Sequence, residues 1–289
     1  MGVITRPFST NEVRKEKDKE GRQMVNQLVI KCGGSTLEQL PASFYKDIAM
    51  LQRQGVLVTI VHGGGPAISA MLKQMGIAPK FVDGLRVTDE ATLQVAQMVL
   101  IGQTNKQIVS NIQMAGGRAA GISGIDGATL QVVQGSRHLG FVGEIQRVDT
   151  MLIAALAHSE LIPVIAPLGI DQSGQIYNVN ADTVAGAVAG AIGAKQLIMV
   201  TDVPGVMQEV EGAKQVLPEL DRKQIDELIA AGVIYGGMIP KVRAALDALE
   251  QQVEEVLIIN GYEPGILHKV AAGDAVGTKI VKKGKVSAQ

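Results

Sequence analysis

The sequence of 289 residues has very little cysteine and few aromatic side chains. Its single cysteine, Cys32, excludes an intrachain disulfide framework and any metal site that needs several cysteines, and it fits a reducing compartment. Four tyrosines, four phenylalanines and no tryptophan leave few rings on which nucleic-acid bases could stack. We therefore expect neither a disulfide-rich secreted protein nor a binder of single-stranded nucleic acid.

The chain also lacks an excess of one charge and a long apolar segment. With 27 basic and 28 acidic residues its net charge is −1, so no broad basic surface for nucleic acid is expected. No apolar run reaches the roughly 18 residues that cross a bilayer, and the N-terminus has no apolar segment of a secretion signal. These absences predict a cytoplasmic protein that binds neither nucleic acid nor a membrane.

What is present divides into two parts. Residues 1–26 include a charged run, 11–20, that is nearly free of apolar residues, and we expect a disordered tail or a solvated helix there. The whole chain is 46% hydrophobic and 19% charged, as an ordinary globular protein is, and no proline- or serine-rich linker interrupts residues 27–289. We therefore expect residues 27–289 to form a single domain.

Short apolar runs and amphipathic stretches alternate from Leu28 onward. The runs expected to form strands are 28–32, 58–62, 119–122, 162–166, 197–201, 256–260 and 279–281. The stretches expected to form helices are 42–54, 66–75, 90–114, 149–158, 181–192, 222–231 and 239–251. Asp149 and Asp221 are expected to cap the starts of two of them, and Gly55, Gly76 and Gly232 to mark helix ends. Two further β-rich segments, 129–133 and 141–148, are expected to pair as a hairpin. The alternation predicts an α/β sandwich around a mostly parallel sheet.

Two glycine-rich turns follow the first two expected strands. Gly33-Gly34 ends the first, and Gly63–Gly65 ends the second with Pro66 next. Glycines past a strand expose backbone N–H groups, and a helix that starts there adds its dipole, so such turns bind anions. Glycines also make ordinary tight turns, but two such turns, one preceded by Lys31, favour a phosphate site. The sequence motifs of the P-loop and of the dinucleotide-binding fold are absent.

Polar residues precede two of the later helices. Asn178, Asn180 and Asp182 lie just before or within the start of an alanine- and glycine-rich helix. One of them could cap that helix, but three polar side chains in five residues exceed what a cap requires. Lys241 follows Gly236-Gly237 in the first turn of another helix, where a cation is unfavourable against the dipole unless an anion lies nearby. Both segments therefore favour a functional interpretation.

Two further segments have both a structural and a functional interpretation, of similar weight for Thr201-Asp202, whereas an isolated arginine such as Arg86 is usually a surface residue. Thr201 and Asp202 end an expected strand, either as a capped turn or as a nucleotide-binding loop at the strand's carboxyl end. Arg86, within Gly84–Asp89, is either a surface residue or a residue whose guanidinium binds a substrate carboxylate through two hydrogen bonds. The residues alone leave both alternatives open.

Taken in order, these segments resemble those of the amino acid kinase family. The resemblance runs from about Leu28 to the C-terminus, and Gly84–Asp89 and Tyr177–Asp182 are similar to the branch that phosphorylates N-acetyl-L-glutamate. It implies a three-layer αβα sandwich, with an N-lobe at about 27–195 for the acyl amino acid and a C-lobe at about 196–289 for ATP. It also implies the second step of arginine biosynthesis, which yields N-acetyl-L-glutamyl 5-phosphate and ADP.

The resemblance implies a role for each motif residue. Those expected to act on the transferred phosphoryl group are Lys31, Lys241 and Asp182, whose carboxylate would orient the two lysines. Those expected to bind the substrate are Gly64, Gly65, Arg86 (on the α-carboxylate), Asn178 (at the acetylated end) and Asn180. Those expected to bind ATP or its phosphates are Gly33, Gly34, Thr201, Asp202, Gly205, Val206, Met207, Tyr235, Gly237 and Met238. No residue is expected to ligate a metal directly, because Mg²⁺ would arrive with ATP, held by phosphate and water.

The chemistry of such a transfer agrees with these residue types. A carboxylate is already ionised at neutral pH, so it needs no general base, and positioning and positive charge supply most of the catalysis. Alternatives stay open: a sibling kinase acting on carbamate, another carboxylate or a nucleotide, or a non-catalytic ligand sensor. A sensor is expected to have lost Lys31, Asp182 or Lys241, and all three are present.

Two segments depart from the pattern of the regulated family members. Members that arginine inhibits resemble one another in an apolar N-terminal helix that links dimers into a hexamer, and residues 1–26 lack such a stripe. Residues 260–268 also depart from the pattern of the arginine site. We therefore expect a homodimer with weak or no arginine feedback. A nitrogen-signalling regulatory protein is a further partner compatible with such an enzyme.

Overall fold

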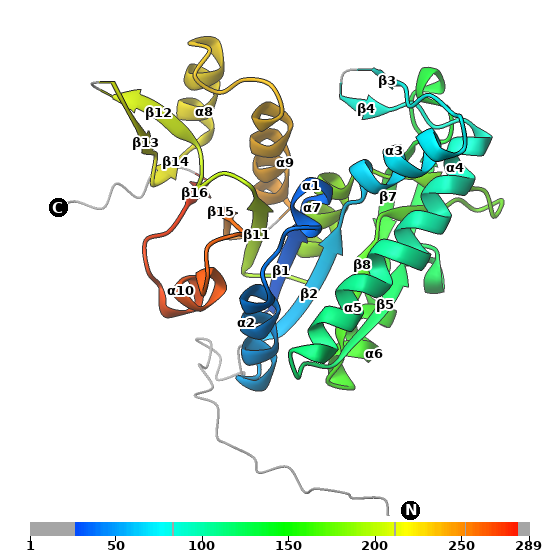
Figure 1. Cartoon of the computed structure of the whole chain (residues 1–289), viewed down its shortest axis with the longest axis horizontal. Coiled ribbons are helices and arrows are strands. Elements are labelled where there is room, and N and C mark those ends of the chain that lie inside the picture. The colour runs from blue at the N-terminus through cyan, green and yellow to red at the C-terminus, as the bar shows by residue number, and fades with distance from the viewer. Residues whose placement is uncertain (1–26, 83, 211, 252, 283–289) are drawn as a thin grey trace, which may run out of the picture.

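Figure 1 shows the computed structural model of the chain, which describes residues 27–82, 84–210, 212–251 and 253–282. The tail expected over residues 1–26 lies outside the described residues. Helices and strands alternate along most of the described chain, as the sequence pattern predicts.

An eight-stranded sheet forms the centre of the molecule. Its strands, in spatial order, are β14 (Glu219–Leu220), β16 (Thr278–Val281), β15 (Glu255–Asn260), β11 (Gln196–Thr201), β1 (Gln27–Cys32), β2 (Leu57–His62), β8 (Ile162–Ala166) and β5 (Ala119–Ser123). The strands from β15 to β5 all pair in parallel, whereas β16 is antiparallel to β15. The predicted mostly parallel sheet is therefore confirmed. Because β1 pairs with β11, the sheet runs without a break through both expected lobes.

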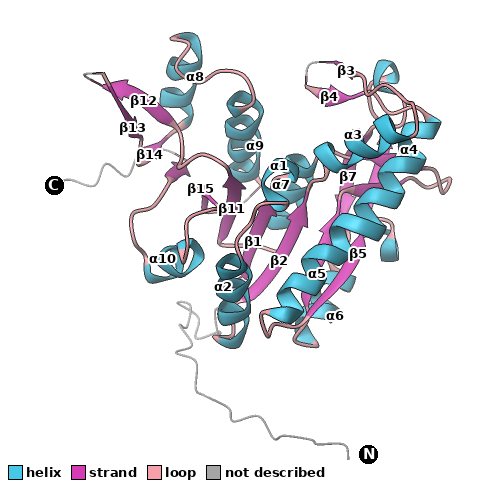
Figure 2. Cartoon of the chain, in the orientation of Figure 1, coloured by secondary structure: helices cyan, strands magenta, loops and turns pink. Residues whose placement is uncertain are grey.

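Helices cover both faces of this sheet and complete a three-layer αβα sandwich (Figure 2). One face packs against α2 (Ala42–Arg53), α5 (Asn105–Met114) and α10 (Ile266–Ala272). The other packs against α6 (Met151–His158), α7 (Ala181–Ala191), α8 (Arg222–Ala230) and α9 (Met238–Glu250). The sandwich that the resemblance implies is confirmed.

Alternation of side chains along each strand explains why both faces are covered. In β1, Leu28 and Ile30 belong to the core formed with α2, α5 and α10, whereas Val29 belongs to the core formed with α7 and α9. All three side chains are at most 6% exposed. A strand buried on both faces needs apolar residues at consecutive positions, which is the pattern seen in the sequence.

A smaller, four-stranded sheet accompanies the first half of the chain. Its order is β10 (Ile176–Asn178), β9 (Leu168–Ile170), β6 (Leu130–Gln134) and β7 (Gly143–Val148). Strands β6 and β7 are antiparallel neighbours, which confirms the predicted hairpin. Two hairpins that the sequence pattern does not predict are β3 (Phe81–Val82) with β4 (Leu85–Arg86), and β12 (Met207–Val210) with β13 (Ala213–Val216).

The helix predicted over 90–114 consists of three consecutive parts. These are α4 (Glu90–Gln97), a π-helical segment η1 (Met98–Thr104) and α5. A π-helical turn holds one residue more than an α-helical turn and often marks a functional site. The remaining described helices are α1 (Gly34–Leu37), α3 (Gly65–Gln74) and the short 3₁₀ turns η2 (Asp126–Ala128) and η3 (Arg137–Leu139). None of the described helices has the length and apolar character needed to cross a bilayer.

The helix starts follow the cap signals of the sequence with two differences. Asp221 caps α8 and forms a capping box with Gln224. Asp149, a residue expected to cap α6, lies one position before the observed cap, Thr150, and instead accepts a hydrogen bond from the Met151 amide at 3.0 Å. Helix α10 is not predicted, because it is short and starts after a glycine without a side-chain cap.

Candidate active site

The two glycine loops lie in contact at the carboxyl ends of β1 and β2. The Gly63 amide donates to the Cys32 carbonyl at 2.9 Å. A methyl group added to Gly34 would lie 2.8 Å from the Gly64 nitrogen and 2.9 Å from the Gly65 nitrogen, so the loops approach too closely for a side chain. Helix α1 begins at Gly34 and α3 at Gly65, so the first N–H groups of two helices are brought together, as an anion site requires.

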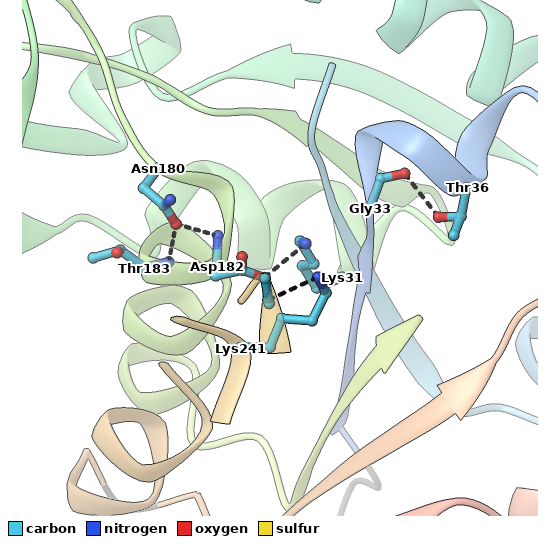
Figure 3. Close-up of polar contacts among 8 residues, drawn as sticks. Lys31, Gly33, Thr36, Asn180, Asp182, Thr183 and Lys241 are labelled. Atoms are coloured by element: carbon cyan, nitrogen blue, oxygen red, sulfur yellow. Dashed lines mark hydrogen bonds and ion pairs between the residues drawn. The ribbon is translucent and has the colours of Figure 1, made fainter. Parts of the chain in front are cut away.

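An ion pair joins β1 to α7 beside these loops (Figure 3). Lys31 Nζ lies 2.7 Å from Asp182 Oδ1, and the two side chains are 7% and 17% exposed. Asp182 is in the first turn of α7, where a carboxylate interacts favourably with the helix dipole. Lys31 Nζ would lie 3.8 Å from a methyl group on Gly33, so the cation lies next to the first glycine loop.

Lys241 lies in the first turn of α9, as the sequence predicts. Its Nζ donates to the Gly237 carbonyl at 3.2 Å, and its side chain lines a cavity together with Asp202. Figure 3 shows it in the same close-up as Lys31 and Asp182. The Asp182 ion pair found among the described residues is with Lys31, so the orientation of Lys241 by Asp182 stays a prediction.

Arg86 is held on three sides and buried to 8% exposure. Its Nη2 donates to the Gly65 carbonyl and to Ser69 Oγ, each at 2.8 Å, and its guanidinium carbon lies 4.7 Å from the centre of the Phe81 ring. Its Nη1 is buried and has no hydrogen-bond partner among the described residues. Burial lowers the pKa of Arg86. A buried guanidinium with donors to spare is suited to a ligand carboxylate.

The two asparagines predicted to bind substrate have different surroundings. Asn178 Nδ2 donates to Thr88 Oγ1 at 3.3 Å, and that hydroxyl donates to the Arg86 carbonyl at 3.1 Å. Asn180 Oδ1 caps α7 by accepting from the amides of Asp182 at 2.8 Å and Thr183 at 3.1 Å. The cap interpretation of Asn180 is therefore confirmed for its oxygen, while a contact of its Nδ2 with substrate stays a prediction.

A cavity of about 180 Å³ connects these groups. Its lining residues are Gly63, Gly64, Gly65, Ile68, Phe81, Gly84, Leu85, Arg86, Leu100, Val142, Pro167, Asn178, Val179, Asn180 and Ala181. Arg86 is the one charged side chain among these residues, and most of the others are apolar or glycine. The cavity can therefore take a small anion that carries apolar and amide groups.

A second cavity, of about 490 Å³, lies in the C-terminal half of the chain. It is lined by Asp202, Val203, Gly205, Val206, Met207, Gln208, Glu209, Lys214, Gly232, Val233, Ile234, Tyr235, Gly237, Met238 and Lys241. The structure thus gathers seven of the residues predicted to bind ATP, namely Asp202, Gly205, Val206, Met207, Tyr235, Gly237 and Met238. Thr201, Gly33 and Gly34 are not among the lining residues. The Thr201 hydroxyl lies 2.9 Å from the Val203 carbonyl oxygen and 3.1 Å from that of Ile259.

Among the residues that the sequence prediction missed are three whose side chains hold Arg86 or line the larger cavity. Ser69 and Phe81 hold Arg86, and Lys214 lines the larger cavity. Ser69 lies four residues after Gly65 on α3, so its helical spacing could have placed it near the loop. Phe81 and Lys214 belong to the two hairpins that the pattern does not predict, and no local signal identifies them.

Two other kinds of site, one built on a reactive cysteine and one on a metal ion, do not fit the residues that the structure describes. Burial raises the pKa of the Cys32 thiol to about 12, so this cysteine is neither a nucleophile nor a metal ligand at neutral pH. No group of three or more His, Cys, Asp and Glu side chains in the described part of the chain could hold a metal ion. The charged side chains that line the two cavities are Arg86 in the smaller one and Asp202, Glu209, Lys214 and Lys241 in the larger one.

The comparisons with known proteins agree with this site. The model of the amino acid kinase family matches residues 26–260. An acetylglutamate kinase from Brevibacillus brevis is 52% identical over 255 residues, which cover 88% of this chain and 96% of the relative. Among solved structures, smu.665 from Streptococcus mutans superposes with a TM-score of 0.79 at 30% identity and covers 90% of this chain and all of its own.

A more distant structure shows the fold alone. Carbamate kinase from Giardia lamblia bound to AMP-PNP superposes with a TM-score of 0.66 at 16% identity, covering 89% of this chain and 99% of its own. The family match spans both cavities and the Lys31–Asp182 pair, and the relative at 52% identity aligns over nearly its whole length. The chain belongs to the amino acid kinase family.

Proposed function

We propose that this protein transfers the γ-phosphoryl group of ATP to the side-chain carboxylate of N-acetyl-L-glutamate, the second step of arginine biosynthesis. The observation that carries the proposal is the small cavity beside the Lys31–Asp182 pair, in which Arg86 is the one charged side chain among the described lining residues. Acetylglutamate kinases at 45–52% identity support it.

The small cavity favours an acylated amino acid over a free one. The guanidinium of Arg86 is suited to the α-carboxylate, which it can meet with its spare Nη1. A free amino acid would also bring an ammonium group, and the described lining residues include no carboxylate to pair with it. An acetamide has no charge to neutralise, and the amides of Asn178 and Asn180 and the apolar side chains around them suit it.

The transfer needs positioning and positive charge. A side-chain carboxylate oxygen attacks the γ-phosphorus, the bond from that phosphorus to the β–γ bridging oxygen breaks, and ADP leaves with the electron pair. Lys31 and Lys241 offset the charge that gathers on the transferred group, and the N–H groups of Gly34, Gly64 and Gly65 donate to its oxygens. Asp182 holds Lys31 in place through the 2.7 Å ion pair.

ATP fits the larger cavity at the carboxyl end of β11. Val206, Met207 and Met238 offer apolar contacts for the base, and Gly237 and Lys241, which line the same cavity, offer donors for the phosphates. Gly33 and Gly34 do not line this cavity, and their N–H groups would meet the phosphates from the loop after β1. Mg²⁺ bound with ATP would offset the negative charge of the phosphate groups. The larger cavity has two carboxylates, Asp202 and Glu209, in its lining, and no group of three or more His, Cys, Asp and Glu side chains among the described residues could hold a metal ion. The residues present therefore fit an ion held mainly by phosphate and water.

The experiment that tests the proposal is ADP release from MgATP with N-acetyl-L-glutamate, with L-glutamate as the control substrate. Turnover with the acetylated compound and little with glutamate is the expected result. Turnover with carbamate, aspartate or a nucleoside monophosphate instead would move the protein to a sibling activity. Binding of N-acetyl-L-glutamate with no turnover would assign it to a ligand sensor.

A cytoplasmic homodimer with weak or no arginine feedback belongs to the same proposal. Met98 and Met114 on the helix formed by α4, η1 and α5 are 56% and 76% exposed, an apolar surface that a second copy could cover. Sedimentation should give twice the chain mass of 30.4 kDa, and millimolar arginine should leave most of the activity. A hexamer that arginine inhibits strongly would contradict both parts.

A further inference from the structure

A pair of buried polar side chains lies behind the second glycine loop. His62 is the last residue of β2 and directly precedes Gly63, and Asn105 is the first residue of α5. Both side chains are completely buried, and their 43-residue separation in sequence is bridged by a hydrogen bond. The transfer reaction described above makes no use of either residue.

The contacts of His62 fix its protonation. Its Nδ1 lies 2.9 Å from the Gly63 carbonyl oxygen, which can only accept, so Nδ1 carries a hydrogen. Its Nε2 lies 3.2 Å from Asn105 Nδ2, which can only donate, so Nε2 carries none. Burial lowers the pKa of His62 to about 4, which keeps the ring neutral at physiological pH. The imidazole is therefore a neutral Nδ1–H tautomer that donates to the glycine loop.

The amide of Asn105 is oriented by groups on neighbouring strands. Its Nδ2 also faces the carbonyl oxygens of Val164 at 2.8 Å and Ile122 at 3.2 Å, both of which only accept. Its Oδ1 accepts from Lys106 Nζ at 3.2 Å. A flipped amide would set its oxygen against carbonyl oxygens, so only one orientation is compatible with these neighbours.

The surrounding backbone is built to admit this pair. A methyl group on Gly121 would lie 1.8 Å from Asn105 Oδ1, so a side chain at 121 would expel the asparagine. A methyl group on Gly64 would lie 2.6 Å from Leu100 Cδ2 and 3.5 Å from Thr104 Oγ1, which both belong to the π-helical segment η1. Consecutive parts of one helix thus contact the glycine loop directly and, through Asn105, the histidine that supports it.

We propose that His62 and Asn105 are positioning residues for phosphoryl transfer, which hold the Gly63 carbonyl so that the amides of Gly64 and Gly65 stay aimed at the transferred group. The role rests on the proposed function, because loop orientation affects a rate only if the loop stabilises the transition state. Oriented N–H donors act mainly in the transition state, so their misplacement lowers kcat more than it raises KM. A residue that served only packing would show no such split.

The first test measures which ring nitrogen of His62 is protonated in the protein without substrates. Proton-coupled ¹⁵N NMR of histidine-labelled protein reports which ring nitrogen carries hydrogen, and His62→Asn identifies the signal among the four histidines. The expected result at pH 7 is a neutral ring protonated on Nδ1, and in Asn105→Leu a mixture of tautomers. An Nε2–H or doubly protonated ring in the unaltered protein would overturn the proposal.

The second test compares variants of His62 with a matched control. His62→Asn keeps a donor near the Nδ1 position and is expected to retain kcat within several-fold, whereas His62→Leu and Asn105→Leu are expected to lower it about 10- to 100-fold with KM for the acceptor little changed. Thr59→Val, a buried polar-to-apolar change on the same strand, is the control and is expected to leave kcat unaltered. Equal losses in all four variants, or losses in KM alone, would overturn the positioning role.

The two tests separate this inference from the proposed function. An unaltered protein that fails to turn over N-acetyl-L-glutamate contradicts the proposed function, while the NMR result still stands for or against the tautomer. An active protein with the wrong tautomer, or with an unaltered rate in His62→Leu, contradicts the positioning role alone. If His62→Leu does not fold, Asn105→Leu and His62→Asn still carry the comparison.

Discussion

Lys31 and Asp182, 151 positions apart in sequence by their residue numbers, meet at 2.7 Å between Nζ and Oδ1. The contact fixes a cation at the carboxyl end of β1 and ties it to the first turn of α7, so the central sheet and the helix layer share one site. Because Lys31 is nearly buried, its charge acts in a medium of lower dielectric than water and stabilises an anion correspondingly more.

The lysines should matter to the rate more than to binding. Lys31→Ala and Lys241→Ala are each expected to lower kcat about 100- to 1,000-fold, because each removes positive charge from the transferred phosphoryl group. Steady-state kinetics in both substrates measures the effect, and Lys73→Ala on α3, outside both cavities, is the control. Near-normal kcat in either active-site variant would refute its assigned role.

Substitution of Arg86 should act on substrate binding. Arg86→Lys keeps the charge but loses the planar fork and the contact with the Phe81 ring, so KM for N-acetyl-L-glutamate is expected to rise about 10- to 100-fold, with kcat affected less. KM for ATP should stay the same. Arg118→Lys, an exposed residue paired with Glu160, serves as the control. An unchanged KM for the acceptor would show that Arg86 does not bind its carboxylate.

The contact between the glycine loops predicts an intolerance to the smallest side chain. Gly34→Ala would push a methyl group to 2.8 Å from a backbone nitrogen, and backbone cannot rotate away as a side chain can. We expect a stability loss of about 1–3 kcal/mol and a loss of activity of about 100-fold or more. Gly102→Ala, which meets no atom within 4 Å, should alter neither, as urea unfolding and kinetics would reveal. Normal activity in Gly34→Ala would mean that the loops separate readily.

His62 predicts how stability depends on pH. Its pKa is about 4 when folded and near the ordinary 6.5 when unfolded, so between these values the unfolded chain binds more protons. Its contribution to the unfolding free energy is constant above about pH 6.5 and falls as pH drops toward 4, by about 3 kcal/mol in total. The nearby Lys106 lowers this pKa in the same direction as burial.

The measurement is urea unfolding of the protein and of His62→Asn at pH 7.5, 6 and 5. The variant lacks the imidazole, so its stability is expected to decline less between pH 7.5 and 5 than that of the unaltered chain. Parallel declines in both proteins would show that His62 is not the group responsible.

Much of the fold could be predicted because its strands are buried on both faces. The consecutive apolar residues of β1, β2, β8 and β11 predict strands that are buried on both faces of a sheet. Gly55, Gly76 and Gly232, which were expected to mark helix ends, all have positive φ. The hairpins β3–β4 and β12–β13 could not be predicted, because short exposed strands carry little apolar periodicity.

The residues of the site likewise include some that could be predicted from the sequence and some that could not. Residues adjacent to the glycine loops, such as Lys31, could be found because strand ends and helix starts are visible in a sequence. Asn105 could not, since it lies in a helix whose periodicity is uninterrupted, and its partner His62 is far away along the chain. The π-helical turn that precedes it is equally hidden, because one extra residue in a long amphipathic stretch alters the pattern too little.

Trapping of the acyl phosphate with hydroxylamine tests phosphorylation of the acetylglutamate side chain most directly. The amine nitrogen attacks the activated side-chain carbonyl, phosphate leaves, and a hydroxamate forms. We expect N-acetyl-L-glutamyl 5-hydroxamate, in amounts equal to the ADP released and dependent on both ATP and N-acetyl-L-glutamate. ADP release without hydroxamate, or a hydroxamate formed from a different acid, would contradict phosphorylation of the acetylglutamate side chain.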